Sequence, residues 1–352
     1  MKKLTINASR SYDILIGEGL LSEAGAYCKE ALGGVCRLCI VSDDTVASLY
    51  LNTAKASLER AGFSVDSFVF PHGESSKNTE VLVSLWEFLA EHRFTRSDAL
   101  FALGGGVVGD LCGFAAATFL RGIRFVQAPT TLLADVDSSV GGKTGVDLRA
   151  GKNLAGAFWQ PSLVLCDTKT LRTLPPEIFA DGCAEVIKYG MINDRALFDG
   201  LAESIQTNIE DVIARCVKHK SEIVEADEFD RGARQLLNLG HTIGHAIEAC
   251  SELTISHGSA VAIGMVIVTR AAVRLGLCPE EDLASLLSLL SSIGLPTECP
   301  YSAEELTRVA LADKKRMGDT ITLVVPFGIG ESKLYPLAVN ELSKFIGKGL
   351  AK

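Results

Sequence analysis

Residues 99–110 read ALFALGGGVVGD, and this stretch decides the fold class of the N-terminal half. An apolar run ends in three glycines and a helical pattern follows it, which is the order strand, turn, helix. Gly104, Gly106 and Gly109 match the spacing G-x-G-x-x-G. Glycines at such a turn let a phosphate approach the free amides that begin a helix, where the helix dipole favours negative charge. The stretch therefore predicts a nucleotide-binding turn in an α/β domain.

Strand and helix patterns alternate on both sides of this turn. Helical patterns cover residues 47–62, 79–92 and 107–120, and strand patterns cover residues 3–8, 12–17, 35–41, 64–70, 99–106, 124–130 and 162–168. The first two strands form a hairpin pattern. The remaining alternation predicts a parallel sheet with helices on both faces.

The pattern changes after Pro175 and Pro176. Helical periodicity then covers residues 184–190, 201–226, 235–250, 259–276 and 280–294, and only residues 321–328 look like a strand. We therefore expect an α/β domain over residues 1–174 and a mostly helical domain over residues 175–352.

Composition limits the classes of function. The chain has 352 residues and a net charge of −9, which disfavours nucleic acid as a partner. Its apolar runs end well short of the about 20 residues that span a membrane, and the N-terminus lacks the pattern of a signal peptide. Ten scattered cysteines in a chain of this size indicate free thiols. We expect a cytoplasmic protein that binds neither membrane nor nucleic acid.

Residues 234–249, RQLLNLGHTIGHAIEA, are the most unusual part of the second half. At 100° per residue one stripe of a helix would hold Arg234, Asn238, His241, His245 and Glu248. Gly240 and Gly244 would each cost about 1 kcal/mol inside that helix, which suggests that another element packs closely on it. The stripe is typical of a functional face.

The spacing of the two histidines leaves their roles open. An i, i+4 pair can bind one ion, as in HExxH helices, but Thr242 stands where that motif has its glutamate. His241 and His245 could equally be one ligand and one acid–base group. Glu185 and His257 are candidates to complete a site, since one glutamate and two histidines with an open position are typical of catalytic zinc. For a nucleotide, Asp43, Asp44 and Glu74 follow strands whose carboxyl ends should converge.

Six segments together resemble 3-dehydroquinate synthase, in order and along nearly the whole chain. They read ALGGGVVGDLCGFAA, RGIRFVQAPTTLLADVDSSVGGKTGV, GKNLAGAFWQP, LPPEIFADGCAEVIKYG, NLGHTIGHAIEA and DKKR. The resemblance implies an N-terminal Rossmann-like nucleotide-binding domain, a mostly α-helical C-terminal domain and a homodimer. It implies conversion of 3-deoxy-D-arabino-heptulosonate 7-phosphate to 3-dehydroquinate and phosphate in the shikimate pathway, with NAD+ and one divalent metal, zinc or cobalt.

The resemblance also implies roles for single residues. Metal would be held by Glu185, His241 and His257, and His245 would transfer protons. The cofactor would contact Asp43, Glu74, Lys77, Gly105, Gly106, Val107, Asp110, Thr130, Thr131, Asp137, Lys143, Lys152, Thr170, Leu171, Arg172 and Thr173. Substrate binding and catalysis would involve Arg121, Asp137, Lys143, Asn153, Lys188, Lys220, Asp230, Arg234, Asn238 and Lys314, with Lys315 as the alternative to Lys314.

Two positions depart from the family pattern. The family commonly has glutamate after His-Gly, where this chain has Ser259, so a carboxylate near the metal is lost. Asp230 stands where many relatives have a glutamate that accepts a proton, and its carboxylate reaches one methylene less far.

Three other functions fit part of the pattern. A cyclase such as 2-deoxy-scyllo-inosose synthase acts on glucose 6-phosphate, which has no carboxylate for Arg234 and Asn238. A metal-dependent alcohol or glycerol dehydrogenase would release NADH. A non-catalytic NAD-binding regulator would have no use for the metal and cation set.

Overall fold

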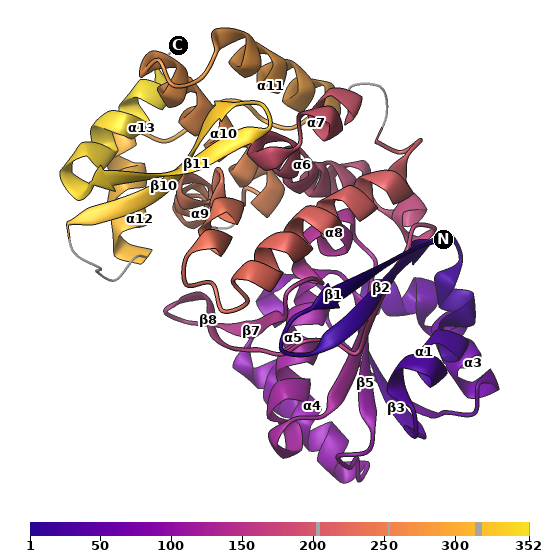
Figure 1. The fold of residues 1–352 in the computed structure, drawn as a ribbon. Helices are drawn as coiled ribbons and strands as arrows, with labels where there is room; N and C mark the ends of the chain where they lie inside the picture. The colour runs from indigo at the N-terminus through magenta and orange to yellow at the C-terminus, as the bar shows by residue number, and fades with distance from the viewer. Residues whose placement is uncertain (202–204, 253, 314–318, 352) are drawn as a thin grey trace. The chain divides into compact units, whose positions relative to one another are not determined.

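The computed structural model describes residues 1–201, 205–252, 254–313 and 319–351. The chain divides into two compact units (Figure 1). The first consists of Met1–Leu174 and Lys220–Phe229, and the second of Pro175–His219 and Asp230–Lys352. The short segment Lys220–Phe229 thus belongs to the first unit although the chain has already entered the second.

A sheet of seven strands forms the first unit. The strands are β1 (Lys2–Asn7), β2 (Ser11–Gly17), β3 (Arg37–Asp43), β4 (Ser64–Phe70), β5 (Ala99–Gly104), β6 (Arg124–Pro129) and β9 (Leu163–Asp167). Their order is β1-β2-β9-β6-β5-β3-β4, and every neighbouring pair is parallel except the hairpin β1–β2. The predicted parallel sheet and the N-terminal hairpin are therefore confirmed, and the carboxyl ends of β3, β4, β5, β6 and β9 meet at one edge.

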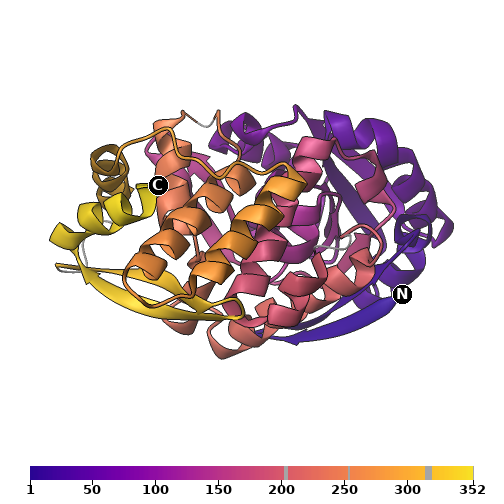
Figure 2. The same cartoon turned by 90° about the horizontal axis from the view of Figure 1, so that it is seen from above.

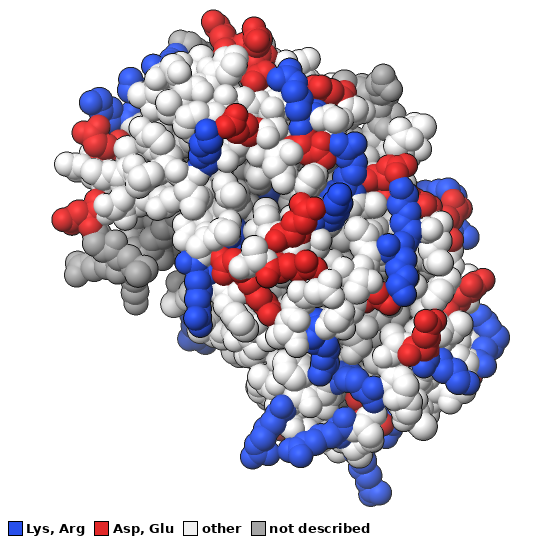
Figure 3. Space-filling model, viewed as in Figure 1, with Lys and Arg blue, Asp and Glu red and all other residues white. Residues whose placement is uncertain are grey.

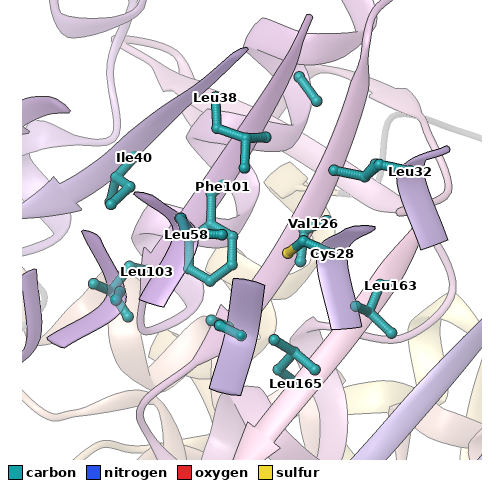
Figure 4. Packing of buried hydrophobic residues seen from close by; sticks show 14 of the residues in the cluster. Cys28, Leu32, Leu38, Ile40, Leu58, Phe101, Leu103, Val126, Leu163 and Leu165 are labelled. Carbon is teal, nitrogen blue, oxygen red and sulfur yellow. The ribbon is translucent and has the colours of Figure 1, made fainter. Parts of the chain in front are cut away.

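Helices cover both faces of this sheet. They are α1 (Ala24–Leu32), α2 (Asp44–Val46), α3 (Asn52–Arg60), α4 (Thr79–Glu91) and α5 (Gly106–Thr118). Successive residues of β3 point to opposite faces: Leu38 and Ile40 pack with residues of α1 and α3, while Cys39 and Val41 pack with residues of α4 and α5. Figure 4 shows the first of these two cores, in which Phe101 lies among side chains from the sheet and the helices.

Helices dominate the second unit, together with one hairpin. They are α6 (Pro176–Asn193), α7 (Arg195–Leu201), α9 (His241–Cys250), α10 (His257–Arg274), α11 (Glu280–Ile293), α12 (Ala303–Asp313) and α13 (Leu342–Leu350), and the hairpin is β10 (Thr320–Gly328) and β11 (Glu331–Ala338). Helix α8 (Ile209–Ala226) begins in this unit. Helix α10 is buried along most of its length and contacts α6, α9, α11, α13 and β10. Figure 2 shows α10 and α11 in orange, and the hairpin β10–β11 and α13 in yellow.

Several expected elements differ from the observed ones. The helix expected over 235–250 is two elements, the 3-10 helix η7 (Ala233–Asn238) and α9, because Gly240 between them adopts a left-handed φ of 77°. The helix expected over 201–226 begins only at Ile209. Two hairpin strands, β7 (Lys143–Leu148) and β8 (Gly151–Phe158), and β11 have no counterpart among the expected strands.

Three general features accompany the fold. No helix in the described part of the chain is long and apolar enough to cross a membrane.

All ten cysteines are free thiols, and burial raises the pKa of Cys28 to about 12. Figure 3 shows Lys and Arg side chains interspersed with Asp and Glu over the face that it draws.

Candidate metal centre and nucleotide site

Helix α6 carries a fully buried ion pair at the centre of the second unit. Glu185 and Lys188 lie one helical turn apart, and each side chain is 1% exposed. The Lys188 ammonium forms a salt bridge with Oε2 of Glu185. A buried carboxylate is stable only when it is paired, and Lys188 provides the paired charge for Oε2. The other oxygen, Oε1, faces the neighbouring helices α9 and α10.

Two histidines meet this second oxygen. The Nε2 atoms of His241 on α9 and of His257 on α10 each lie 3.4 Å from Oε1 of Glu185. The ligand atoms of all three residues lie within 4.8 Å of one another. The structure thus brings together the one glutamate and two histidines that the sequence offered as candidates, from three different helices.

Hydrogen bonds at the far side of each imidazole fix this orientation. Nδ1 of His241 lies 3.1 Å from the backbone carbonyl oxygen of Leu239, and Nδ1 of His257 lies 3.4 Å from Oε2 of Glu248. Both partners are acceptors, so each ring donates from Nδ1 and leaves the Nε2 lone pair facing Glu185 in its neutral form. Metal-bound histidines in proteins are oriented in this way.

The two histidines differ in their electrostatic surroundings. Burial is the main effect on His241 and lowers its pKa to about 3, although Glu185 opposes the shift. Burial also acts to lower the pKa of His257, but hydrogen bonds to Glu185 and Glu248 outweigh it and raise the pKa to about 10. His241 is therefore ready to act as a neutral ligand, whereas His257 must release a proton before its Nε2 can bind an ion.

The donor set fits a zinc-like ion. One carboxylate oxygen and two imidazole nitrogens converge, which is the usual protein share of a catalytic zinc site with an open position. A second convergent set, His245, Glu248 and His257, uses the opposite side of the His257 ring. Among the described residues, neither set contains both His241 and His245. The structure therefore does not favour the hypothesis that these two histidines bind one ion as an i, i+4 pair.

Two glycines let the ligand helices approach closely. A Cβ on Gly240 would lie 2.7 Å from the carbonyl oxygen of Val261 in α10, and its left-handed backbone disfavours any side chain. A Cβ on Gly258 would lie 2.1 Å from the carbonyl oxygen of Asp181 in α6. The close packing predicted for Gly240 is confirmed, but its predicted place inside a helix is wrong, since it precedes α9.

A carboxylate does lie at the start of α10, although Ser259 replaces the usual glutamate. Oδ1 of Asp181 on α6 accepts a hydrogen bond of 3.0 Å from the backbone N–H of Ser259 and another from the hydroxyl of Ser256. The first turn of α10, which carries His257, is therefore capped from α6. This contact could not be predicted from sequence spacing, because Asp181 and Ser259 are 78 residues apart along the chain.

The remaining candidates of the second unit lie on or near η7. Arg234 is buried in η7, Asn238 ends that helix and is exposed, and Asp230 precedes it with a φ of 56°. The predicted single stripe from Arg234 to Glu248 is wrong, because the chain changes direction at Gly240. Element η7 contacts α6, the helix of Glu185. Lys314 and Lys315 lie outside the described residues.

In the first unit, charged candidates cluster near the start of α5. The Lys77 ammonium lies 2.6 Å from Oδ2 of Asp110 and 2.6 Å from Oδ1 of Asn153. Burial opposes the charge on Lys77, but Asp110 and Glu74 outweigh it and raise its pKa. Close by, Nζ of Lys152 lies 3.7 Å from Oε1 of Glu74. Four predicted cofactor residues and one predicted substrate residue therefore share one cluster.

Asp147 is a residue of this cluster that the sequence did not reveal. Its Oδ1 accepts a 2.7 Å hydrogen bond from the backbone N–H of Asn153, and its own N–H donates to the carbonyl oxygen of Lys77. Asn153 adopts a φ of 55°. Asp147 therefore holds the β7–β8 turn against the segment after β4.

The glycine turn packs against the segment that follows β6. A Cβ on Gly105 would lie 3.0 Å from Cγ2 of Thr131, and one on Gly106 would lie 3.1 Å from Oγ of Ser138. The Thr130 N–H donates to the carbonyl oxygen of Gly104. The predicted cofactor residues Thr130 and Thr131 therefore lie beside the turn.

Other predicted cofactor residues lie along the same carboxyl edge. Asp43 ends β3 and caps α2 through the Val46 N–H. The 3-10 helix η6 (Thr170–Thr173) follows β9, and the Thr173 hydroxyl lies 2.5 Å from the hydroxyl of Tyr50. Asp137 lies 3.1 Å from the ammonium of Lys220, a residue that belongs to this unit. Val107 lies in the first turn of α5, whereas Lys143 begins β7, which belongs to a separate two-stranded sheet.

Arg121 is a candidate of the first unit that lies away from the glycine turn. It follows the C-terminal end of α5, whereas Gly105 and Asp110 lie at its N-terminal end. The helix has 13 residues, so the two ends are roughly 20 Å apart. Arg121 is exposed there, with a φ of 68°. Its predicted contact with substrate stays a prediction.

Comparison with known proteins agrees with this architecture. Family models for the N-terminal and C-terminal parts of 3-dehydroquinate synthase match residues 67–181 and 182–316. A 3-dehydroquinate synthase of Streptococcus suis (strain 05ZYH33) is 45% identical over 98% of this chain and 99% of its own.

Two solved structures share the fold over nearly their whole length. One is 2-deoxy-scyllo-inosose synthase complexed with carbaglucose-6-phosphate, NAD+ and Co2+, with 27% identity, 99% and 100% coverage and a TM-score of 0.87. The other is 2-epi-5-epi-valiolone synthase of Streptomyces hygroscopicus subsp. jinggangensis 5008 with NAD+ and Zn2+, with 28% identity, 97% and 98% coverage and a TM-score of 0.87. With both family models and a near full-length relative in agreement, the chain belongs to the 3-dehydroquinate synthase family.

Proposed function

We propose that this protein is a phosphate-eliminating lyase that converts 3-deoxy-D-arabino-heptulosonate 7-phosphate to 3-dehydroquinate and phosphate. The observation that carries the proposal is the convergence of Glu185, His241 and His257 in a chain of this family. In the reaction a substrate alcohol is oxidised, phosphate is eliminated, the ketone is reduced again and the opened sugar closes by an intramolecular aldol step. Oxidation and reduction cancel, so the nicotinamide is not consumed.

The second unit would hold the metal and prepare the substrate hydroxyl. Glu185, His241 and His257 would hold one divalent ion, zinc or cobalt, which lowers the pKa of a bound hydroxyl and polarises a carbonyl. Lys188 supplies a fixed positive charge to Glu185 and to anionic substrate oxygens. His245, exposed one turn after His241, would move protons, with Asp230 as a further acceptor.

The first unit would hold NAD+ at the carboxyl edge of its sheet. The turn Gly105–Gly106 and the start of α5 suit the pyrophosphate, with Asp43, Glu74, Lys77 and Asp110 around it. The remaining residues that we assign to NAD+ binding are Val107, Thr130, Thr131, Asp137, Lys143, Lys152, Thr170, Leu171, Arg172 and Thr173. Asn153, Lys220 and Lys143 would contribute to substrate binding. When bound, NAD+ accepts and returns one hydride.

The two ligands would bind to different domains of the protein. We assign the cofactor to the first unit, residues 1–174 with Lys220–Phe229, and the metal and most of the substrate to the second unit, which holds the rest of residues 175–352. The protein would act as a homodimer in the cytoplasm, within the shikimate pathway.

Arg234 favours a substrate that has a carboxylate, and therefore this reaction over that of the inosose synthase. Arg234 offers a guanidinium, whose planar donors match a carboxylate, and Asn238 ends the same short helix. Glucose 6-phosphate has a phosphate but no carboxylate. A seven-carbon acid sugar therefore uses Arg234, which a six-carbon neutral sugar would not.

One experiment distinguishes these functions. Purified protein with zinc and NAD+ is incubated with the seven-carbon substrate, and the product mass, free phosphate and NADH are followed. The proposal expects dehydroquinate and stoichiometric phosphate without accumulating NADH. Steady NADH formation would identify a dehydrogenase, and turnover of glucose 6-phosphate in place of the acid sugar would identify an inosose synthase.

A further inference from the structure

Glu248 is a buried carboxylate that the proposed reaction does not use. It lies on α9, two turns after His241, and only 4% of its surface is exposed. Its Oε2 accepts a hydrogen bond from Nδ1 of His257, nine residues later on α10. Burying a carboxylate requires compensating partners, and the imidazole of His257 is one of them.

The two proposed histidine ligands differ in what holds them. His241 donates from Nδ1 to the neutral carbonyl of Leu239, whereas His257 donates to the charged carboxylate of Glu248. Charge-assisted hydrogen bonds are about twice as strong as neutral ones. A carboxylate behind the imidazole also makes its Nε2 a stronger donor to an ion.

The position of His257 makes such an anchor necessary. His257 is the first residue of α10, and its side chain is 32% exposed against 13% for His241. Neighbouring side chains therefore restrict its ring less. Asp181 accepts hydrogen bonds from the Ser259 N–H and the Ser256 hydroxyl, so it fixes the backbone at this helix end and not the imidazole.

We propose that Glu248 is a positioning residue that orients His257 toward the metal and sets the affinity of the site. The inference rests on the proposed metal site of Glu185, His241 and His257. Glu248 itself would not bind the ion, because its carboxylate faces Nδ1, while Nε2 faces Glu185. It deepens the proposed function by naming the residue on which metal retention depends.

Metal affinity of the full-length protein tests the inference without substrate or NAD+. Zinc affinity is measured by competition with a chromophoric chelator, in the wild type and in Glu248→Ala and Glu248→Gln. We expect Glu248→Ala to weaken zinc binding by about 10- to 100-fold, the usual range for removing such a partner. Glu248→Gln keeps an acceptor oxygen but loses the charge, so it should weaken binding less.

Spectroscopy of the cobalt-loaded protein separates orientation from mere stability. Ligand N–H protons give exchangeable, paramagnetically shifted NMR signals, and we expect one for His241 and one for His257. In Glu248→Gln only the His257 signal should move. If Glu248→Ala fails to fold, this spectrum and the affinity of Glu248→Gln decide the matter.

Four further variants make the outcomes distinct. Glu252→Gln removes an exposed carboxylate just beyond α9 and should bind zinc like the wild type. If His241→Ala loses zinc while both Glu248 variants bind it normally, the inference is overturned and the metal site stands. If His245→Ala loses zinc and Glu185→Gln does not, the ion belongs to the set His245, Glu248 and His257, and Glu248 is a ligand instead. If His241→Ala binds zinc normally, the proposed metal site fails as well.

Discussion

At the scale of single residues, groups outside the proposed ligand set orient the two histidine ligands: the carbonyl oxygen of Leu239 holds His241, and the carboxylate of Glu248 holds His257. Glu185, His241 and His257 lie in or beside helical patterns of the sequence, and the resemblance predicted that they share one site. Glu248 and the carbonyl of Leu239 gave no such signal, because a hydrogen bond between two helices leaves no spacing in the sequence. Residue chemistry was therefore predictable, and the contacts that fix it were not.

The buried pair Glu185–Lys188 gives a prediction at this scale. Lys188→Met should lower the free energy of unfolding of the metal-free protein by about 3 kcal/mol, since it removes the buried cation that pairs with Oε2 of Glu185 and leaves His257 as the charged partner of the other oxygen. Added zinc should restore part of the loss, because the ion supplies positive charge to Glu185. Urea unfolding with and without zinc measures both effects.

An exposed pair with the same spacing is the control. Lys344 lies 3.6 Å from Glu341 in α13, and both side chains are more than half exposed. Lys344→Met should leave the unfolding midpoint unchanged, since solvent screens such pairs. Equal losses in the two variants would show that Lys188 contributes no more than a surface charge.

At the scale of elements, Gly240 decides where α9 begins, and hydrophobic periodicity alone did not predict that boundary. The period of the histidine stretch continued through Gly240, so a single helix was expected. A left-handed residue interrupts a helix without changing the hydrophobic pattern around it. The β10–β11 hairpin shows the converse: β11 is largely exposed, so it lacks the buried apolar run that marked its partner.

Gly240 and Gly276 form a matched pair for testing this point. Both have left-handed φ, 77° and 71°, but a Cβ on Gly276 would meet no heavy atom within 4 Å, whereas one on Gly240 would meet α10. Gly276→Ala should cost about 1 kcal/mol of stability from backbone strain alone. Gly240→Ala should cost clearly more and weaken zinc binding, because Leu239 and His241 flank it. Equal costs with intact zinc affinity would contradict the close approach of α9 and α10.

The junction of α6, α7 and α8 gives a prediction about pH. Burial acts to raise the pKa of Asp194, but hydrogen bonds from Arg215, His219 and the Leu197 N–H outweigh it and lower the pKa to about 2. The folded-state pKa lies below the unfolded value of about 3.9, so the carboxylate stabilises the fold above that pH. This contribution is lost as the pH falls toward 2.

Asp194→Asn should therefore lower the free energy of unfolding by about 2 kcal/mol at pH 7. The gap between variant and wild type should narrow as the pH falls below about 4. Denaturant unfolding at several pH values measures it. Asp199→Asn, which changes an exposed acid on α7, should match the wild type throughout. A gap of constant size from pH 7 down to pH 3 would exclude the carboxylate as its source.

At the scale of the whole molecule, the alternation of strands and helices predicted the parallel sheet, and the change of pattern after Pro176 predicted helices. It did not predict that Lys220–Phe229 belongs to the first unit. That segment continues the regular pattern of α8, and its assignment depends on contacts such as Lys220 with Asp137. Lys220 thus joins the cofactor candidates of the first unit although the chain reaches it from the second.

The division into two units leads to a prediction about ligand-induced stability. Each ligand at a hundredfold excess over its Kd should stabilise the fold by about 2.7 kcal/mol. His241→Ala should abolish the stabilisation by zinc and keep that by NAD+, because His241 and the glycine turn belong to different units. Lys77→Met should do the reverse, since it removes the cation that pairs with Asp110 beside the turn. Thermal unfolding of both variants with each ligand alone measures these four effects. Loss of both stabilisations in His241→Ala, with the fold intact, would show that the two ligands do not have separate sites, and the assignment of cofactor and metal to different units would fail.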